Sequence, residues 1–132
     1  MLPLCDTVAI CTALGPETTG LITARRLALM KPSAFLINIA RGPVIDEDAL
    51  YAGLRDRTVG GAAIDVWWQY PNPSDPTRRG SRHPFHELPN VIVTPHNSGW
   101  TAGMVRRRWD EIADNIARFA HGDSVINVVT KT

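Results

Sequence analysis

Four short apolar runs divide the chain into regular segments, at residues 8–11, 35–39, 62–66 and 91–94. Each run is continuously apolar rather than alternating between apolar and polar residues. Such runs are typical of parallel strands that are covered on both faces. We therefore predict four buried strands at these positions.

Capping signals between the runs predict helices. Thr23 can cap a helix that extends through Met30, where Pro32 ends it. Three acidic residues at 46–48 fall in the first turn of a segment that runs to about Arg55, where they favour a helix through its dipole. Strands that alternate with helices predict an α/β fold, with right-handed crossovers between parallel strands.

The last predicted helix covers about residues 102–121, after a Thr101 cap. Its apolar residues recur every three or four positions from Val105 to Phe119, with Trp109 among them, and Gly122 supplies the stop. We expect this stripe to be buried. Before it, residues 71–89 form a long proline-rich loop, of a length that is usually functional or mobile.

Composition excludes several classes of protein. The 132 residues are 44% hydrophobic and 20% charged with a net charge of +1, which excludes disorder and a strongly basic nucleic-acid-binding surface. No apolar run is long enough for a membrane span, and the first residues do not resemble a signal peptide. Cys5 and Cys11 show neither a disulfide framework nor metal spacing, and we expect Cys11 to be a buried thiol. These features predict a cytoplasmic protein without nucleic-acid, membrane or metal partners.

Three residues with useful chemistry follow the predicted strands. Arg41 follows the second strand, Asp65 lies near the end of the third, and His96 follows the fourth. Each alone has an ordinary explanation as a loop charge, a turn cap or a hydrogen-bonded histidine. Because ligands of parallel sheets bind at the carboxyl ends of the strands, the three together favour a functional site. Histidine exchanges protons near neutral pH, and arginine offers a planar fork to a carboxylate.

Several longer segments resemble the NAD-dependent D-isomer-specific 2-hydroxyacid dehydrogenases. They are residues 16–22, 29–32, 36–50, 61–67 and 88–96, and they include the Asn-Ile-Ala-Arg-Gly signature at 38–42. The resemblance covers nearly the whole chain, and the blocks keep the order and spacing of the family. It implies hydride transfer between NAD, with NADP not excluded, and a small 2-keto or 2-hydroxy acid.

The resemblance also implies roles for individual residues. Arg41 matches the arginine that binds the substrate carboxylate, and His96 matches the acid/base that exchanges a proton with the substrate oxygen. Asp65 matches the residue that holds the nicotinamide carboxamide. The remaining positions that it places beside the cofactor are Thr12, Ala13, Ala40, Ser98 and Gly99.

One departure from the family affects the acid/base. The family usually has Asp-Val-Phe-x-x-Glu-Pro, in which the glutamate pairs with the histidine, whereas here Tyr70 occupies the glutamate position. A carboxylate stabilises imidazolium, and a phenol cannot do so by charge. Formate dehydrogenases, a branch of the family, carry a neutral glutamine there. We therefore expect a less basic His96, held by a hydrogen bond from Tyr70, and an optimum for reduction at lower pH. Ala13, where the family often has proline, is a minor departure.

The Gly-x-Gly-x-x-Gly fingerprint of dinucleotide-binding domains is absent, since no two of the ten glycines are separated by a single residue. We therefore expect residues 1–132 to be a fragment, the C-terminal half of a Rossmann-like doubly wound parallel sheet in a three-layer α/β/α domain. By family analogy, the final helix leads back toward a substrate domain, the first strand becomes an exposed edge and the complete protein is a homodimer. We expect the isolated fragment to be marginally stable or oligomeric. The alternative is a non-catalytic module that acts by protein interaction, as the corepressors of this family do.

Other residues leave alternatives open. Trp67 and Trp68 come just after Asp65 and Val66, and the sequence leaves open whether each lines a pocket or packs in the core. His83 and His86 are expected to be solvated at the surface. The arginine cluster at 106–108 is better explained by i,i+4 ion pairs, Arg106 with Asp110 and Arg107 with Glu111, than by nucleic-acid binding.

Overall fold

The structure is a computed structural model that describes residues 1–129, and it divides into two compact units. The first unit is Met1–Ser98, and the second begins at Gly99. The first unit contains all four strands and every predicted site residue except Gly99, so the two units are described separately.

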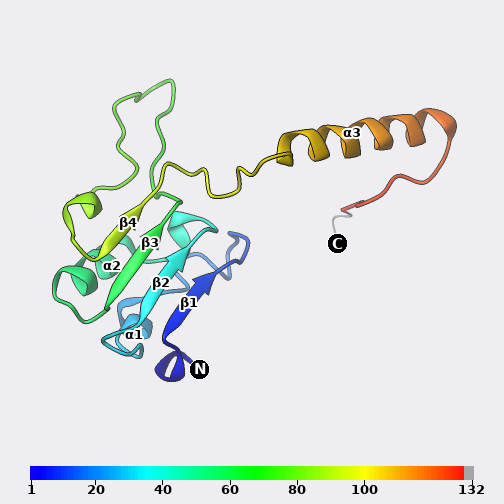
Figure 1. The fold of residues 1–132 in the computed structure, drawn as a ribbon. Helices are drawn as coiled ribbons and strands as arrows, with labels where there is room; N and C mark the ends of the chain where they lie inside the picture. Colours follow the sequence, from blue (N-terminus) through cyan, green and yellow to red (C-terminus); the bar gives the residue numbers. More distant parts are fainter. Residues whose placement is uncertain (130–132) are drawn as a thin grey trace. The chain divides into compact units, whose positions relative to one another are not determined.

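The first unit is built on a four-stranded parallel sheet in the order β1-β2-β3-β4 (Figure 1). The strands are β1 (Thr7–Ile10), β2 (Phe35–Asn38), β3 (Gly61–Ile64) and β4 (Val91–Val93). All four predicted strands are confirmed, and each ends one or two residues earlier than the apolar run suggested. The last one or two residues of each predicted run lie outside the strand and enter the connecting loops.

The register brings the four strand ends into line. Ile10, Asn38, Ile64 and Val93 occupy one row across the sheet. The chain therefore leaves all four strands at the same edge, which is where ligands bind in open α/β sheets.

Both helices of this unit are capped as predicted. Thr23 accepts a hydrogen bond from the Arg26 amide ahead of α1 (Ala24–Leu27), and Asp46 accepts one from the Ala49 amide ahead of α2 (Glu47–Arg55). Helix α1 is shorter than predicted. Its continuation to residue 30 tightens into i→i−3 hydrogen bonds, the geometry of a closing turn, before Pro32.

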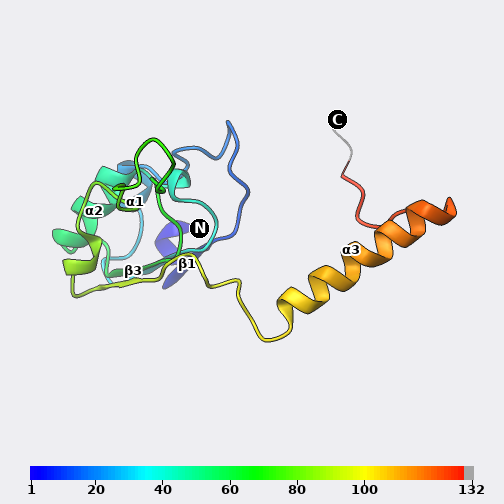
Figure 2. The same ribbon diagram turned by 90° about the horizontal axis from the view of Figure 1, so that it is seen from above.

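Both helices lie on the same face of the sheet, as Figure 2 shows. The core between them and the strands includes Leu36, Leu50, Leu54 and Ile64, each at most 1% exposed. On the opposite face of β4, Ile92 is 60% exposed. The first unit therefore contributes two of the three expected layers. Strand β1 forms one edge of the sheet, as the resemblance implied.

The long loop over residues 71–89 has more structure than predicted. A 3₁₀ turn, η3 (Phe85–Glu87), lies within it, and Phe85 is buried in the core. The Phe85 ring stacks on Trp68 at 5.3 Å and meets the edge of Tyr51. Two further 3₁₀ turns, η1 (Leu2–Leu4) and η2 (Gly42–Val44), complete the unit.

The second unit contains helix α3 (Met104–His121), which begins later than predicted. Its N-cap is Gly103 with φ 78°, and no side chain caps it, so the predicted Thr101 cap is wrong. The Gly122 stop is confirmed, with φ 79°. No side chain of α3 is buried, and Trp109 is 64% exposed, so the predicted burial of the apolar stripe is wrong within this unit. The segment after the helix folds back through hydrogen bonds between Asn115 and Ile126 and covers little of the stripe.

The predicted charge pairs on α3 form in part. Arg106 and Asp110 lie 3.8 Å apart, whereas Arg107 donates to Thr101 instead of pairing with Glu111. Among the described residues, no helix is both long and apolar enough to span a bilayer.

Candidate active site at the carboxyl ends of the strands

The turn that carries Arg41 is shaped by a buried asparagine at the end of β2. Asn38, 1% exposed, donates through its amide nitrogen to the Arg41 carbonyl at 3.0 Å and accepts from the Ala40 amide at 3.1 Å. Gly42 follows, and a β-carbon there would lie 2.3 Å from the Trp67 carbonyl carbon. Only glycine permits this approach, which sets the Arg41 turn directly against the chain that leaves β3.

A pocket of about 560 Å³ opens where β1 and β2 end. Its lining includes four predicted cofactor-side residues, Thr12, Ala13, Ala40 and Arg41. Cys11 lines the same pocket and is exposed, so the prediction of a buried thiol is wrong. The reason is that β1 ends at Ile10, one residue before the apolar run does.

Asp65 holds the loop that carries His96. Asp65 is buried, with 4% of the residue exposed. One oxygen accepts from the Thr94 hydroxyl at 2.6 Å and the Asn97 amide at 2.9 Å, and the other accepts from the Ser98 hydroxyl at 2.5 Å. The Ser98 amide donates to both oxygens, at 3.3 and 3.2 Å. The structure therefore gives Asp65 a role that the sequence did not reveal, as the anchor of residues 94–98.

The hydrogen bonds decide the charge of this carboxyl group. Burial alone raises the pKa of Asp65, but the hydrogen bonds from Ser98, Thr94 and Asn97 outweigh it and lower the pKa from 3.8 to about 2. Asp65 is therefore an ionised, buried carboxylate at neutral pH.

His96 lies on the anchored loop in a left-handed backbone conformation, with φ 60°. Its Nδ1 lies 2.9 Å from the Tyr70 hydroxyl, and that hydroxyl accepts a hydrogen bond from the Trp67 amide at 3.0 Å. The other ring nitrogen, Nε2, has no partner among residues 1–129. The predicted contact between Tyr70 and His96 is therefore present, and Nε2 is the nitrogen left for a ligand.

The two tryptophans after Asp65 have different surroundings. Trp68 packs on Phe85 and donates through Nε1 to the Ile45 carbonyl at 2.8 Å, so it belongs to the core. Trp67 donates through Nε1 to the Thr94 carbonyl at 3.1 Å and lines a second pocket, of about 460 Å³. Tyr70 lines this second pocket, whereas Arg41 lines the first.

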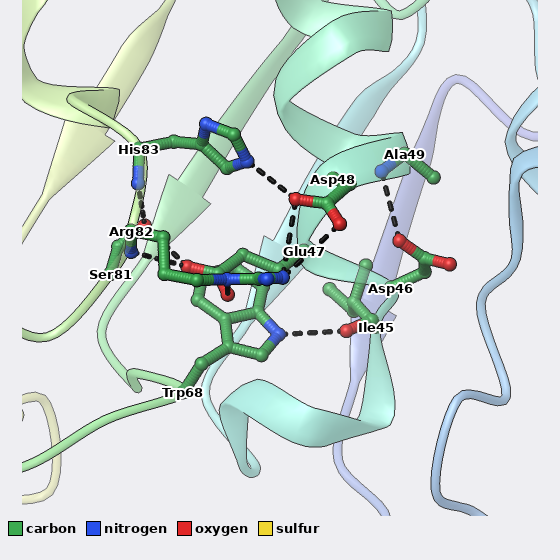
Figure 3. A network of polar contacts seen from close by, with 9 residues as sticks. All are labelled: Ile45, Asp46, Glu47, Asp48, Ala49, Trp68, Ser81, Arg82 and His83. Atoms are coloured by element: carbon green, nitrogen blue, oxygen red, sulfur yellow. Dashed lines mark hydrogen bonds and ion pairs between the residues drawn. The ribbon is translucent and has the colours of Figure 1, made fainter.

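A polar network that the sequence analysis missed ties the long loop to the start of α2 (Figure 3). Glu47, 7% exposed, accepts from the Ser81 hydroxyl and the Arg82 amide at 2.7 Å each, and from Arg82 Nε at 3.0 Å. Asp48 accepts from Arg82 and lies 2.6 Å from His83 Nε2. The His83 hydrogen bond is the main cause that lowers the pKa of Asp48.

The same network corrects the prediction for one histidine. His83 stacks on Tyr51 at 4.5 Å and contacts Asp48, so it is a structural residue rather than a solvated one. His86 is solvated as predicted, with a side chain 70% exposed. The acidic run at 46–48 was the only feature of the sequence that pointed to this network. Its favourable interaction with the helix dipole already explained it, so the sequence alone did not require a partner in the long loop.

The residues present fit part of a dinucleotide site. The first pocket and the His96 loop lie at the carboxyl ends of the strands, where ligands bind in open α/β sheets. The chain has no glycine-rich loop for the pyrophosphate. Within residues 1–129, no group of three His, Cys, Asp or Glu side chains is placed to hold a metal ion.

A parallel sheet with cationic, acidic and imidazole side chains along its carboxyl edge defines a ligand-binding α/β domain of the Rossmann-like class. Residues 1–98 match the family described as "D-isomer specific 2-hydroxyacid dehydrogenase, NAD binding domain". The chain belongs to this family. The match ends where the first compact unit ends.

Individual relatives agree with this assignment. The chain is 38% identical over 117 residues to a glycerate dehydrogenase of Methylorubrum extorquens, covering 89% of this chain and 36% of the relative. It is 36% identical to a glyoxylate reductase of Thermofilum pendens, covering 99% of this chain and 37% of the relative. The chain thus spans about a third of the length of these curated relatives.

Solved structures show the same fold. A D-isomer specific 2-hydroxyacid dehydrogenase from Xanthobacter autotrophicus, solved with NADPH and MES, is 37% identical with a TM-score of 0.78, and the match covers 98% of this chain and 50% of that one. A D-lactate dehydrogenase from Lactobacillus jensenii, solved with NAD⁺, is 27% identical with a TM-score of 0.85, covering 98% and 41%.

Proposed function

We propose that this chain supplies the catalytic residues for reversible hydride transfer between NAD(H) and a small 2-keto or 2-hydroxy acid. In this proposal Arg41 binds the substrate carboxylate, and His96 Nε2 exchanges a proton with the substrate oxygen. The observation that carries it is the histidine on an anchored loop, with Nδ1 held by Tyr70 and Nε2 without a partner in the described chain. NAD, when bound, supplies or accepts the hydride. NADP remains an alternative cofactor in the proposal.

In this proposal Arg41 binds and orients the substrate. It is exposed at the rim of the first pocket, and its backbone is fixed by Asn38 and by the contact of Gly42 with Trp67. Its guanidinium donates to the Ala40 carbonyl at 2.6 Å, which leaves further N–H groups for a carboxylate. A bidentate pair would fix the keto group relative to His96.

Tyr70 determines which ring nitrogen of neutral His96 carries the hydrogen, and it adds no charge beside the ring. Because the Tyr70 oxygen accepts from the Trp67 amide, its own hydrogen has His96 Nδ1 as an acceptor at 2.9 Å. This donation favours the neutral ring with hydrogen on Nε2 over the ring with hydrogen on Nδ1. When the ring is protonated, the phenol turns and accepts from Nδ1–H, without the attraction that a carboxylate adds.

The consequence concerns the pH at which each direction runs. Reduction needs the protonated ring as acid, and oxidation needs a lone pair on Nε2. Tyr70 stabilises neither form by charge, and its donated hydrogen bond stabilises a form that serves neither step directly. The reductive rate should therefore be greatest at lower pH than with a glutamate at this position.

The test is NADH oxidation, followed at 340 nm, with glyoxylate, hydroxypyruvate and related keto acids, using the protein expressed from its own gene. We expect turnover of at least one keto acid and a loss of about 10²–10⁴-fold in kcat for His96→Asn. Arg41→Gln should mainly raise KM. His86→Asn and Arg25→Gln are matched controls on exposed residues. No turnover of any 2-keto acid, or a His96→Asn variant with the wild-type rate, would refute the proposal.

The finer expectations belong to the same proposal. A cytoplasmic location stays a prediction from the composition and the cysteines, and a homodimeric complete protein stays a prediction of the family resemblance. The non-catalytic alternative predicts no turnover in the same assay, so a single experiment separates the two functions.

A further inference from the structure

The second pocket is not where the reaction proposed above takes place, although Tyr70, which holds His96, is one of its lining residues. It lies between the chain segments that leave β3 and β4 and the returning arm of the long loop, and its volume is about 460 Å³. Small-molecule sites occupy roughly 300–1,000 Å³. Its walls are mainly apolar, from Trp67, Pro71, Val93 and the ring of Tyr70.

Hydrogen bonds and close packing hold these walls in place. The Gln69 amide donates to the Gly80 carbonyl at 2.8 Å and closes the base of the loop. Gly80 has φ 49°, and a β-carbon there would lie 2.9 Å from the Trp67 ring, so the loop backbone rests directly on the indole. On the other side, the Trp67 indole is fixed by its bond to Thr94. The pocket is therefore formed before any ligand arrives.

The charge of the lining selects a class of ligand. Arg78 and Arg79 line the pocket, and its lining has no acidic side chain. Arg78 lies 3.3 Å from Asp75, which balances its charge. No carboxylate among residues 1–129 lies within ion-pairing distance of Arg79. One uncompensated guanidinium beside apolar and aromatic walls matches a flat apolar body that carries one carboxylate.

The pocket reaches His96 only through Tyr70, because Tyr70 lines the pocket and His96 does not. Tyr70 binds His96 at Nδ1, and the proton that reacts is on Nε2 across the ring. A ligand against the Tyr70 ring would therefore not displace a substrate from Nε2. Tyr70 is 40% exposed, so such a ligand would cover it and restrict its motion.

We propose that this pocket binds a small aromatic carboxylate as an effector, which acts on His96 through Tyr70. Binding orders the Tyr70 hydroxyl on Nδ1 and favours the neutral imidazole. The effect on rate rests on the proposed function: the ligand lowers kcat for reduction above neutral pH and leaves KM for the keto acid unchanged. Binding itself does not depend on that function.

The experiment is an NMR titration of the full chain with 2-naphthoate, following the Trp67 indole N–H and the His96 ring nitrogens. We expect both signals to shift together and to saturate. Arg79→Gln should weaken binding about tenfold, as expected for loss of a charge-assisted hydrogen bond. Arg108→Gln, a matched change in the second unit, should not alter it. The uncharged 2-naphthamide should bind at least tenfold more weakly.

Three results would overturn the proposal in part or whole. Absence of saturable shifts at Trp67, or equal affinity in the Arg79→Gln variant, would refute the site. Shifts at Trp67 with an unchanged His96 ring would refute the coupling. Because the spectra need no turnover, an inactive protein that still binds the probe would refute the proposed function alone.

Discussion

Replacing Asp65 by asparagine tests the anchor beneath His96. The pKa of Asp65 is about 2, against 3.8 for an unperturbed carboxyl group, because hydrogen bonds from Ser98, Thr94 and Asn97 outweigh the cost of burial. At 1.36 kcal/mol per pKa unit, ionised Asp65 stabilises the fold by about 2 kcal/mol. Since the folded pKa is the lower one, this stability is complete above about pH 5 and is lost progressively as the pH falls through 3.8 to 2 and below.

Urea unfolding, followed by tryptophan fluorescence between pH 2 and pH 7, measures this difference. Asp65→Asn should lower the free energy of unfolding at pH 7 by at least about 2 kcal/mol, because the amide also presents N–H groups to donors. The gap to wild type should shrink below pH 4. Asp6→Asn, which removes an exposed ion pair with Lys31, should change stability little at any pH. A gap that stays constant from pH 7 to pH 2 would refute the assignment of the stability to ionised Asp65.

Substitutions at three further positions, Tyr70, Gly42 and Glu47, test the other contacts that hold the site and the long loop. Tyr70→Phe should shift the hydrogen of neutral His96 from Nε2 toward Nδ1, which ¹⁵N chemical shifts of the ring report, and Tyr51→Phe is the control. Tyr70→Glu should extend the pH range of the reductive reaction upward by about one pH unit or more. Unchanged ¹⁵N shifts and unchanged pH profiles would contradict the proposed role of Tyr70. Gly42→Ala should lower the free energy of unfolding in urea by about 1–3 kcal/mol, because its β-carbon would overlap the Trp67 backbone. Gly15→Ala is the control, since its added β-carbon meets only one atom, at 4.0 Å. Equal effects of the two substitutions would contradict the close approach of Gly42 to Trp67. Glu47→Gln should weaken the hydrogen bonds that hold Ser81 and Arg82, and should speed tryptic cleavage after Arg78 or Arg79 about tenfold. Glu87→Gln is the control. Unchanged cleavage would show that Glu47 does not hold the loop.

The sheet and the position of the site followed from the sequence because both depend on local patterns. Continuous apolar runs separated by capped segments specify parallel strands, and parallel strands place their carboxyl ends at one edge. Thr23 and Asp46 cap α1 and α2 through contacts three residues away. Contacts between residues so close in the chain can be predicted from a short stretch of sequence.

The anchors of the site did not follow, because they join residues far apart in the chain. Glu47 meets Ser81 across 34 positions, and Asp65 meets Ser98 across 33. No spacing rule connects such pairs, and each acid already had a sufficient local explanation. The predicted burial of the apolar stripe on α3 was wrong for a different reason. The pattern correctly indicates an amphipathic helix, but burial needs a partner surface, which the second unit does not provide.

His96 is held in two ways, by the hydrogen bonds of Asp65 to its loop and by the contact of Tyr70 with Nδ1, and this explains how Tyr70 can replace the glutamate of the family. A left-handed backbone at a non-glycine residue costs roughly 1–2 kcal/mol, and the bonds of Asp65 to Asn97 and Ser98 offset that cost without involving the imidazole. The position of the histidine is therefore fixed through its backbone, while the partner of Nδ1 fixes only the ring and its proton. A hydroxyl held by the Trp67 amide meets that second requirement. In the proposed function, Tyr70 at this position therefore changes the electrostatics of the His96 ring and leaves its placement intact, so we expect its effect in the pH profile and not in the stability of the fold.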